Sequence, residues 1–236
     1  MVEISPKAAF AKGFRATLPF LIVVTPFSML FGVVAQEAGL QLAQTMGFTI
    51  LVIAGAAQFA ALQMMVDGAT LPLVLLAALA VNLRMAMYSA ALVPHLGKAS
   101  LRVRALAAYL LFDQTYAISV AAYEKDPTWQ LPQKIGFYFG VAVPLASVWC
   151  SMTLVGALIG SAVPPEFALD FALPITFLAL IAPMLRSLAH VVAALVSVVV
   201  ALALSGLPTG VGLIIAAIAA MVAGALVETW AERHSK

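Results

Sequence analysis

Long, nearly uncharged apolar runs separated by short polar breaks dominate the pattern of hydrophobic and polar positions. A helix needs about 20 apolar residues to cross the hydrocarbon core of a bilayer, and these runs lack the alternation of barrel strands. They occupy residues 17–35, 45–66, 69–95, 105–123, 135–161, 171–185, 187–204 and 210–227. The pattern therefore predicts an all-α, polytopic membrane bundle of about six to eight segments, of which 171–185 and 187–204 are short for full crossings.

Proline and glycine interrupt several of the predicted helices. They stand at Pro19, Pro26, Gly55, Pro72, Pro144, Pro174 and Pro183. An interior proline removes a helical hydrogen bond and kinks or unwinds the helix, and paired broken helices mark midplane sites in secondary transporters. Residues 18–26 loosely echo residues 173–183, which leaves open an internal inverted repeat. The simpler interpretation is that prolines are common in membrane helices.

Composition changes the picture by excluding a water-soluble fold. Hydrophobic residues make up 64% of the 236 residues and charged residues 9%, against about a quarter charged in soluble domains. We therefore expect a single integral-membrane transporter domain over residues 1–236. The net charge of +2 does not favour a nucleic-acid partner. With one cysteine, three histidines and no His-Glu-x-x-His motif, we expect no cofactor, no metal site and no intramembrane enzyme.

Lysine and arginine in short loops set the orientation of a membrane protein. If all eight segments cross and the N-terminus is cytoplasmic, eight basic residues lie inside and Lys98, Arg102 and Arg104 lie outside. If one segment before residue 95 and segment 105–123 both fail to cross, all eleven basic residues other than Arg84 lie inside. Both alternatives place both termini in the cytoplasm.

Arg84 and Asp113 are charges embedded in two consecutive apolar runs. A charge near the bilayer centre costs at least about 2.5–3.5 kcal/mol, so both must face a protein interior or a water-filled cavity. One interpretation is a structural ion pair. The other is a transport site, in which Arg84 clamps a carboxylate and Asp113 receives an ammonium group or a coupling proton. Helical spacing places Tyr88 on the face of Arg84, and Tyr109 and Tyr116 on that of Asp113.

Two buried amides extend the candidate site. Gln58 follows Gly55-Ala56-Ala57 and either binds a polar end of the substrate or links two closely packed helices. Asn82 points away from Arg84 on a regular helix. Gly156 and Gly160 form a small-xxx-small pattern, which indicates helix packing or a subunit contact.

The chain resembles the AzlC (YgaZ-like) family, the large subunits of bacterial branched-chain amino-acid exporters. The resemblance rests on Gly13-Phe14-Arg15 through Leu18-Pro19 to Phe31-Gly32, Gly55-Ala56-Ala57-Gln58-Phe59, Asn82-Leu83-Arg84 with Tyr88-Ser89, Asp113-Gln114, and Leu173-Pro174 to Pro183-Met184-Leu185. Two positions depart from the family pattern. Met85 stands where an aromatic residue or histidine is frequent, and Gln114 stands where an acidic residue is common.

The resemblance implies proton-coupled export of valine, leucine and isoleucine across the bacterial inner membrane, together with a small AzlD-type membrane subunit. A zwitterion with an apolar side chain needs a cationic clamp, polar acceptors and an apolar pocket. The candidate substrate-binding residues are Arg84, Gln58, Asn82, Asp113 and Tyr88. The alternatives are an exporter or channel for another small metabolite, or a structural membrane subunit.

Overall fold

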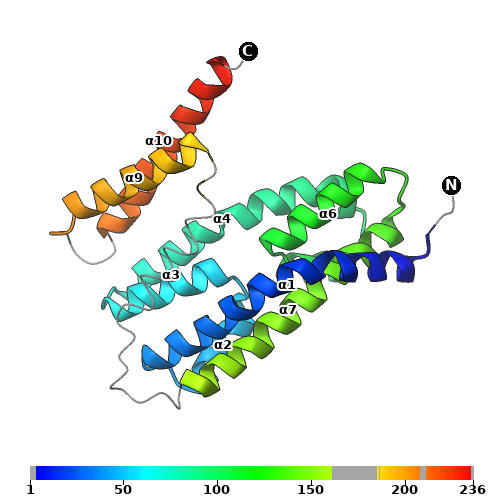
Figure 1. Cartoon of the computed structure of the whole chain (residues 1–236), viewed down its shortest axis with the longest axis horizontal. Coiled ribbons are helices and arrows are strands. Elements are labelled where there is room, and N and C mark those ends of the chain that lie inside the picture. Colours follow the sequence, from blue (N-terminus) through cyan, green and yellow to red (C-terminus); the bar gives the residue numbers. More distant parts are fainter. Residues whose placement is uncertain (1–3, 161–184, 186, 208–210, 235–236) are drawn as a thin grey trace. The chain divides into compact units, whose positions relative to one another are not determined.

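The computed structural model describes residues 4–160, 185, 187–207 and 211–234 (Figure 1). Within these ranges the chain forms nine helices, which confirms the predicted all-α fold. They are α1 (Pro6–Glu37), α2 (Leu42–Val52), α3 (Gly55–Val66), α4 (Leu71–Leu96), α5 (Leu101–Tyr109), α6 (Asp113–Lys125), α7 (Leu131–Gly160), α9 (Leu188–Ala203) and α10 (Val211–His234). The chain divides into a first unit, residues 1–59 with 78–163, and a second unit, residues 60–77 with 164–236.

Four of these helices, α1, α4, α7 and α10, are long and apolar enough to cross a membrane, and α2, α3 and α9 are shorter apolar helices. The long helix α1 begins at Pro6, where the Ser5 side chain caps it by accepting a hydrogen bond from the backbone N–H of Ala8. Helix α1 runs without a break through Pro19 and Pro26. These two prolines therefore do not end the helix, and the breaks lie elsewhere in the chain.

Helices α1 and α7 lie side by side and form the wall of the first unit (Figure 1). Their backbones approach so closely that a Cβ atom added at Gly140 would lie 2.2 Å from the carbonyl oxygen of Phe10. A Cβ atom at Gly156 would lie 1.8 Å from the carbonyl oxygen of Met29. Because Phe10 pairs with Gly140 and Met29 with Gly156, the two helices run in the same direction.

Segment 45–66, predicted as one span, is two helices joined by a break. Ile53 ends α2 in the left-handed conformation, with φ 42° and ψ 37°. Two residues later, Gly55 begins α3 against the rings of Phe27 and Trp149, where a Cβ atom would lie within 3.0 Å of either ring. A β-carbon therefore has no room at this turn.

Helices α2 and α3 form a hairpin, of which α2 and residues 55–59 at the start of α3 belong to the first unit. Helix α2 begins beside the end of α1, where the Gln36 Nε2 donates to the Thr45 Oγ1 at 3.0 Å. It then runs against the direction of α1. After the break, α3 returns in the direction of α1, since Gly55 lies beside Phe27 and the ring of Phe59 packs on Phe31.

Segment 105–123 is likewise a helical hairpin rather than one span, because the chain leaves the helix at residues 110–112. Helix α5 follows directly on the end of α4. Helix α6 then runs parallel to α4, from Asp113 beside Arg84 to the ring of Tyr123, 4.9 Å from that of His95. Both ends of this hairpin therefore lie at the C-terminal end of α4.

The turn between α2 and α3 and the turn between α5 and α6, which we call the tips of the two hairpins, lie next to each other. The hydroxyl of Tyr109, at the end of α5, donates to the carbonyl of Ile50 near the end of α2. The open end of the α5–α6 hairpin lies beside the start of α7, where the Lys134 Nζ is 3.3 Å from the His95 Nδ1. The start of α2 lies at the opposite end, beside the C-terminus of α1.

Both hairpins fall on predicted segments, 45–66 and 105–123, and whether these segments cross the membrane stays a prediction. In the first unit the basic residues other than Arg84 gather at the end that holds the N-termini of α1 and α7 and the C-terminus of α4. They are Lys7, Lys12, Arg15, Lys98, Arg102, Arg104, Lys125 and Lys134. The total number of crossings stays a prediction, because segment 171–185 and the second half of the proposed repeat fall almost wholly outside the described residues.

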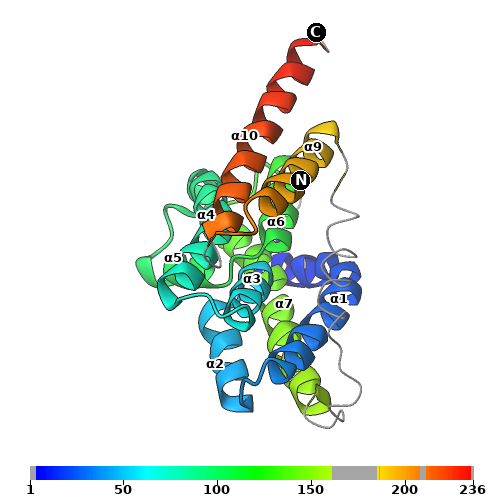
Figure 2. The same cartoon turned by 90° about the vertical axis from the view of Figure 1, so that its left-hand side faces the viewer.

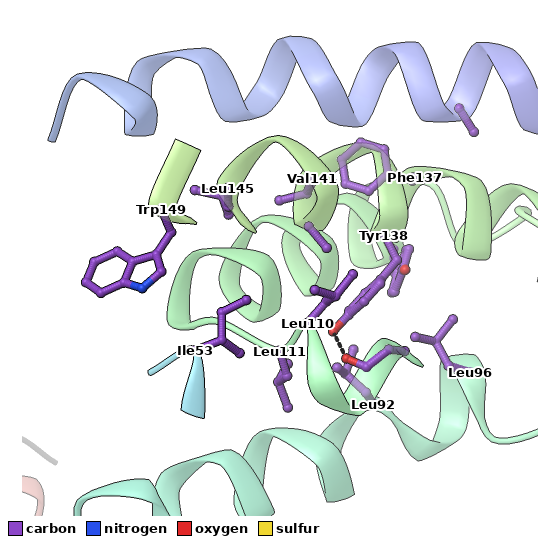
Figure 3. Close-up of a cluster of buried hydrophobic side chains, with 14 of the residues drawn as sticks. Ile53, Leu92, Leu96, Leu110, Leu111, Phe137, Tyr138, Val141, Leu145 and Trp149 are labelled. Carbon is purple, nitrogen blue, oxygen red and sulfur yellow. Dashed lines mark hydrogen bonds between the residues drawn. The ribbon is translucent and has the colours of Figure 1, made fainter. Parts of the chain in front are cut away.

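A buried apolar cluster fills the space between α4, the α5–α6 hairpin and α7 (Figure 3). Its members from α7 include Tyr138, which lines a groove with Leu92 and Leu111, and Trp149, which packs against the turn at Gly55. The hydroxyl of Tyr138 donates to the carbonyl of Ala107 on α5 at 2.6 Å. The hairpin is therefore held to α7 by a buried hydrogen bond as well as by apolar contact.

In the described part of the second unit, α9 and α10 lie side by side (Figure 2). They run antiparallel, since Gly224 faces Ala193 and Gly212 faces Leu204. The Ser187 side chain caps α9 by accepting from the backbone N–H of His190.

We expect Gly156→Ala to destabilise the first unit, because the new methyl group overlaps a backbone carbonyl that cannot move without separating α1 from α7. Overpacking of this kind costs about 1–3 kcal/mol, seen as a lower midpoint of thermal unfolding in detergent. The control is Gly47→Ala, whose added Cβ meets nothing within 4 Å and which removes a helical glycine, for a gain of about 0.5–1 kcal/mol. Equal midpoints for the two variants would contradict the close helix contact.

Candidate functional site

The site is built on the ion pair between Arg84 and Asp113. The Arg84 Nη2 lies 3.1 Å from the Asp113 Oδ2. Arg84 stands in the middle of α4, and Asp113 is the first residue of α6. The positive end of the α6 dipole favours a carboxylate at that position. The ion pair that the sequence permitted between Arg84 and Asp113 is therefore formed. Because the helix break puts Asp113 at the start of α6, the dipole of α6 also stabilises its negative charge.

The ion pair leaves part of its hydrogen-bonding capacity unused. The Arg84 Nε and the Asp113 Oδ1 are buried atoms without a hydrogen-bond partner. A guanidinium has five N–H donors, and a carboxylate accepts several hydrogen bonds. The contact is also single rather than the two-pronged arrangement that Arg and carboxylate form when the pair is strongest. Both side chains are partly exposed, at 27% for Arg84 and 42% for Asp113, so a further polar group has access to them.

Two stacked tyrosine rings stand beside the ion pair. Tyr88 is one helical turn beyond Arg84, and Tyr116 is three residues beyond Asp113. Their ring centroids are 4.2 Å apart with an interplanar angle of 10°. Tyr88 lies close enough to interact electrostatically with both charges, as its spacing from Arg84 predicts. The rings thus form an aromatic wall on one side of the charged pair.

Tyr109 does not join this group, although a continuous helix would have placed it on the face of Asp113. The break at residues 110–112 separates the two residues, and the Tyr109 hydroxyl bonds to the Ile50 carbonyl instead. Its contact joins the tips of the two hairpins. The expectation for Tyr109 was wrong because it assumed that segment 105–123 is one helix.

Gln58 makes its contact within the α2–α3 hairpin and not with the ion pair. Its side chain is fully buried, and the Nε2 donates to the Thr49 Oγ1 at 3.1 Å, while the Oε1 has no partner. Asn82 stands two residues before Arg84, about 200° around α4, and its buried Oδ1 is also unpartnered. The structure therefore brings Arg84, Asp113 and Tyr88 together and gives Gln58 a separate place at the other hairpin.

Sequence reasoning missed a line of buried hydroxyl groups on α6. Thr115, Ser119 and Tyr123 recur every four residues and are buried, and the hydroxyl oxygens of Thr115 and Ser119 have no hydrogen-bond partner. The signal was present as a polar side chain at each turn of an otherwise apolar segment. The line begins next to Asp113 and runs toward the end of the first unit that carries the basic residues.

We expect Thr49→Val to destabilise the protein by about 1–3 kcal/mol, because the buried amide of Gln58 then loses its acceptor. Removing both groups in Thr49→Val/Gln58→Leu should recover most of that loss, since two apolar groups leave no buried donor unsatisfied. Thermal unfolding in detergent of both single variants and the double variant measures the coupling between the residues. Additive losses would show that the hydrogen bond does not link the hairpin arms.

Comparison with known proteins gives one family. The sequence model of the AzlC protein family matches residues 19–163, more than half of the chain. An uncharacterized membrane protein of Archaeoglobus fulgidus is 31% identical over 194 residues, which cover 79% of this chain and 80% of the relative. The inner membrane protein YgaZ of Escherichia coli is 28% identical over 184 residues, covering 74% and 72%. No solved structure matches the chain.

Proposed function

The chain belongs to the AzlC family of multi-pass membrane proteins, and on this premise we propose that it is a secondary transporter that exports branched-chain amino acids from the cytoplasm. The family resemblance supports valine, leucine and isoleucine as substrates, the proton gradient as the driving force and a small AzlD-type subunit as the partner. The relative YgaZ is named an inner membrane protein, which supports the same location here.

The observation that carries the proposal is the partly satisfied ion pair of Arg84 and Asp113. A zwitterionic amino acid carries the same two charges as the pair. Its carboxylate takes the place of Asp113 at the guanidinium, and its ammonium group takes the place of Arg84 at the Asp113 carboxylate. The substrate thus replaces one charge pairing by two, which limits the cost of desolvating its charges.

Alternating access requires that the empty and loaded sites favour different arrangements of the helices. Arg84 lies on the long helix α4 and Asp113 on the tip of a hairpin, so opening the ion pair removes the charged contact between α4 and α6 and leaves the stacking of Tyr88 on Tyr116. Protonation of Asp113 also removes its attraction to Arg84, and this gives the carboxylate a role in proton coupling. Broken helices around a central site are a common design of secondary transporters.

The charge distribution supports a cytoplasmic location for the end of the first unit that carries the basic residues. Export then proceeds from this end toward the end at which α1 finishes. The sequence near the C-terminus also carries the basic residues Arg233 and Lys236, and by the same charge rule we propose that both termini are cytoplasmic.

Export of labelled leucine tests the substrate assignment. Cells that express this chain with its small subunit should lose preloaded leucine, valine and isoleucine faster than cells that lack both genes, and unlabelled substrate should compete. Equal efflux from the two strains would contradict export. Ionic current without saturable competition would favour the channel alternative.

Substitution of Arg84 tests the site. We expect Arg84→Lys and Arg84→Ala to lower efflux about tenfold or more, because a hydrogen bond to a charged group contributes about 1.5–3 kcal/mol and an ammonium group does not reproduce a guanidinium. Asp113→Asn should abolish the dependence of efflux on external pH. The matched control is Arg233→Lys in α10, which should export normally. Wild-type efflux from Arg84→Ala at normal expression would favour a structural role.

A further inference from the structure

A groove lies between the last turns of α4, helix α5 and α7, on a part of the first unit that the transport proposal does not use. Its volume is about 90 Å³. Leu92, Leu96, Leu111 and Tyr138 form its buried floor. The Tyr138 hydroxyl is already engaged with the Ala107 carbonyl. The floor therefore offers an occupant apolar surface and no free hydroxyl donor, which suits a short stretch of hydrocarbon.

The rim of the same groove is cationic. Arg104 lines it and is exposed. Lys98 and Arg102 are also exposed, on the turn and helix that lead to Arg104. No acidic residue occurs between positions 97 and 112, so nothing in this stretch neutralises the three charges. An anionic group at the rim would be attracted by all of them.

The N-terminus of α5 points to the same kind of ligand. The N-cap residue Ser100 makes no capping hydrogen bond through its side chain, so its hydroxyl does not satisfy the free N–H groups of the first turn. Arg102 adds positive charge at the positive end of the helix dipole, where cations are unfavourable. A bound anion offsets both costs, since it accepts from the N–H groups and its negative charge lowers the repulsion between Arg102 and the helix dipole.

The position of the groove along α4 determines the shape of the ligand. Helix α4 is a candidate membrane span that ends at Leu96, so Lys98 and Ser100 follow at the boundary of the hydrocarbon. The groove extends back along α4 as far as Ser89, which is about two turns into the apolar region. A ligand with a charged head at the boundary and an apolar chain below it matches both parts.

We propose that this groove binds one anionic phospholipid, with its phosphate at Arg104 and the N-terminus of α5, and with the start of an acyl chain on the floor formed by Leu92, Leu96, Leu111 and Tyr138. A soluble anion leaves the apolar floor uncovered. A zwitterionic lipid carries no net negative charge to match the three cations. Anionic lipids are attracted to basic segments next to a membrane span by about 1 kcal/mol for each Lys or Arg.

Lipid retention by the purified full-length chain tests this site. Native mass spectrometry in detergent should show one tightly retained palmitoyl-oleoyl phosphatidylglycerol, and weaker retention of phosphatidylcholine with the same chains. Arg104→Gln should weaken retention about fivefold, the factor that about 1 kcal/mol corresponds to. Arg102→Gln removes a nearby charge that does not line the groove, and it should weaken retention less. Arg233→Gln, which removes an exposed arginine of α10, is the control and should leave retention unchanged.

A second pair of variants tests the apolar part without changing charge. Ala108→Phe places a ring at the rim of the groove, whereas Ala105→Phe makes the same change at an exposed position of α5 that does not line it. Only Ala108→Phe should lower phosphatidylglycerol retention. The proposal is overturned if phosphatidylcholine is retained equally, if glycerol 1-phosphate or leucine displaces the lipid at equal concentration, or if the two alanine variants behave alike. Because the readout is lipid binding, its failure is distinct from a failure of amino-acid export.

Discussion

A backbone that leaves the helical conformation inside a membrane exposes carbonyl and amide groups that lipid cannot satisfy. The first unit contains two such breaks, after Val52 and after Tyr109, and the rest of its architecture supplies their partners. The Tyr109 hydroxyl meets the Ile50 carbonyl and the Tyr138 hydroxyl meets the Ala107 carbonyl. Each bond is made by a tyrosine of one element to the backbone of another, so the hairpin tips are stable only when the elements are assembled.

The close glycine contact between α1 and α7 also supports the two hairpins, because it forms the surface on which they pack. Two helices that approach through glycines occupy less width than helices separated by larger side chains. They run parallel, which is possible for neighbours in space because α2 to α6 intervene in the chain. Their paired length provides a wall against which both hairpins pack, one from each end. The aromatic rings of Phe27, Phe31 and Trp149 fill the space around the turn at Gly55.

The sequence predicts the long spans well because composition alone determines them. Residues 17–35, 69–95 and 135–161 lie within or almost within α1, α4 and α7. The positions of the helix breaks, in contrast, are not predicted by the sequence. Leu110, Leu111 and Phe112 are large apolar residues that fit an uninterrupted helix, whereas Pro19, Pro26 and Pro144 suggest breaks and lie inside continuous helices. What ends α5 is a set of tertiary contacts, and local propensity does not encode them.

Because local sequence does not encode tertiary contacts, it predicts some contacts between candidate residues better than others. Charge in an apolar run is a strong signal, because a lipid-facing Arg84 or Asp113 is too costly, and the two residues do meet. The amide of Gln58 is a weaker signal, since many buried groups can bond to it, and Thr49 on the neighbouring arm of the hairpin accepts from its Nε2. An embedded charge therefore restricts the possible partners far more than an embedded amide does.

Placing Asp113 at the start of a short helix, instead of in its middle, changes what the ion pair can do. A carboxylate fixed in the middle of a long helix would move only with that helix. At a hairpin tip, it is held by one guanidinium contact and by a helix dipole that falls off within a turn. The unpaired Arg84 Nε and Asp113 Oδ1 show that the contact is not saturated. In the transport cycle that we propose, a pair of this kind closes the site in the absence of substrate and opens when another pair of charges replaces it.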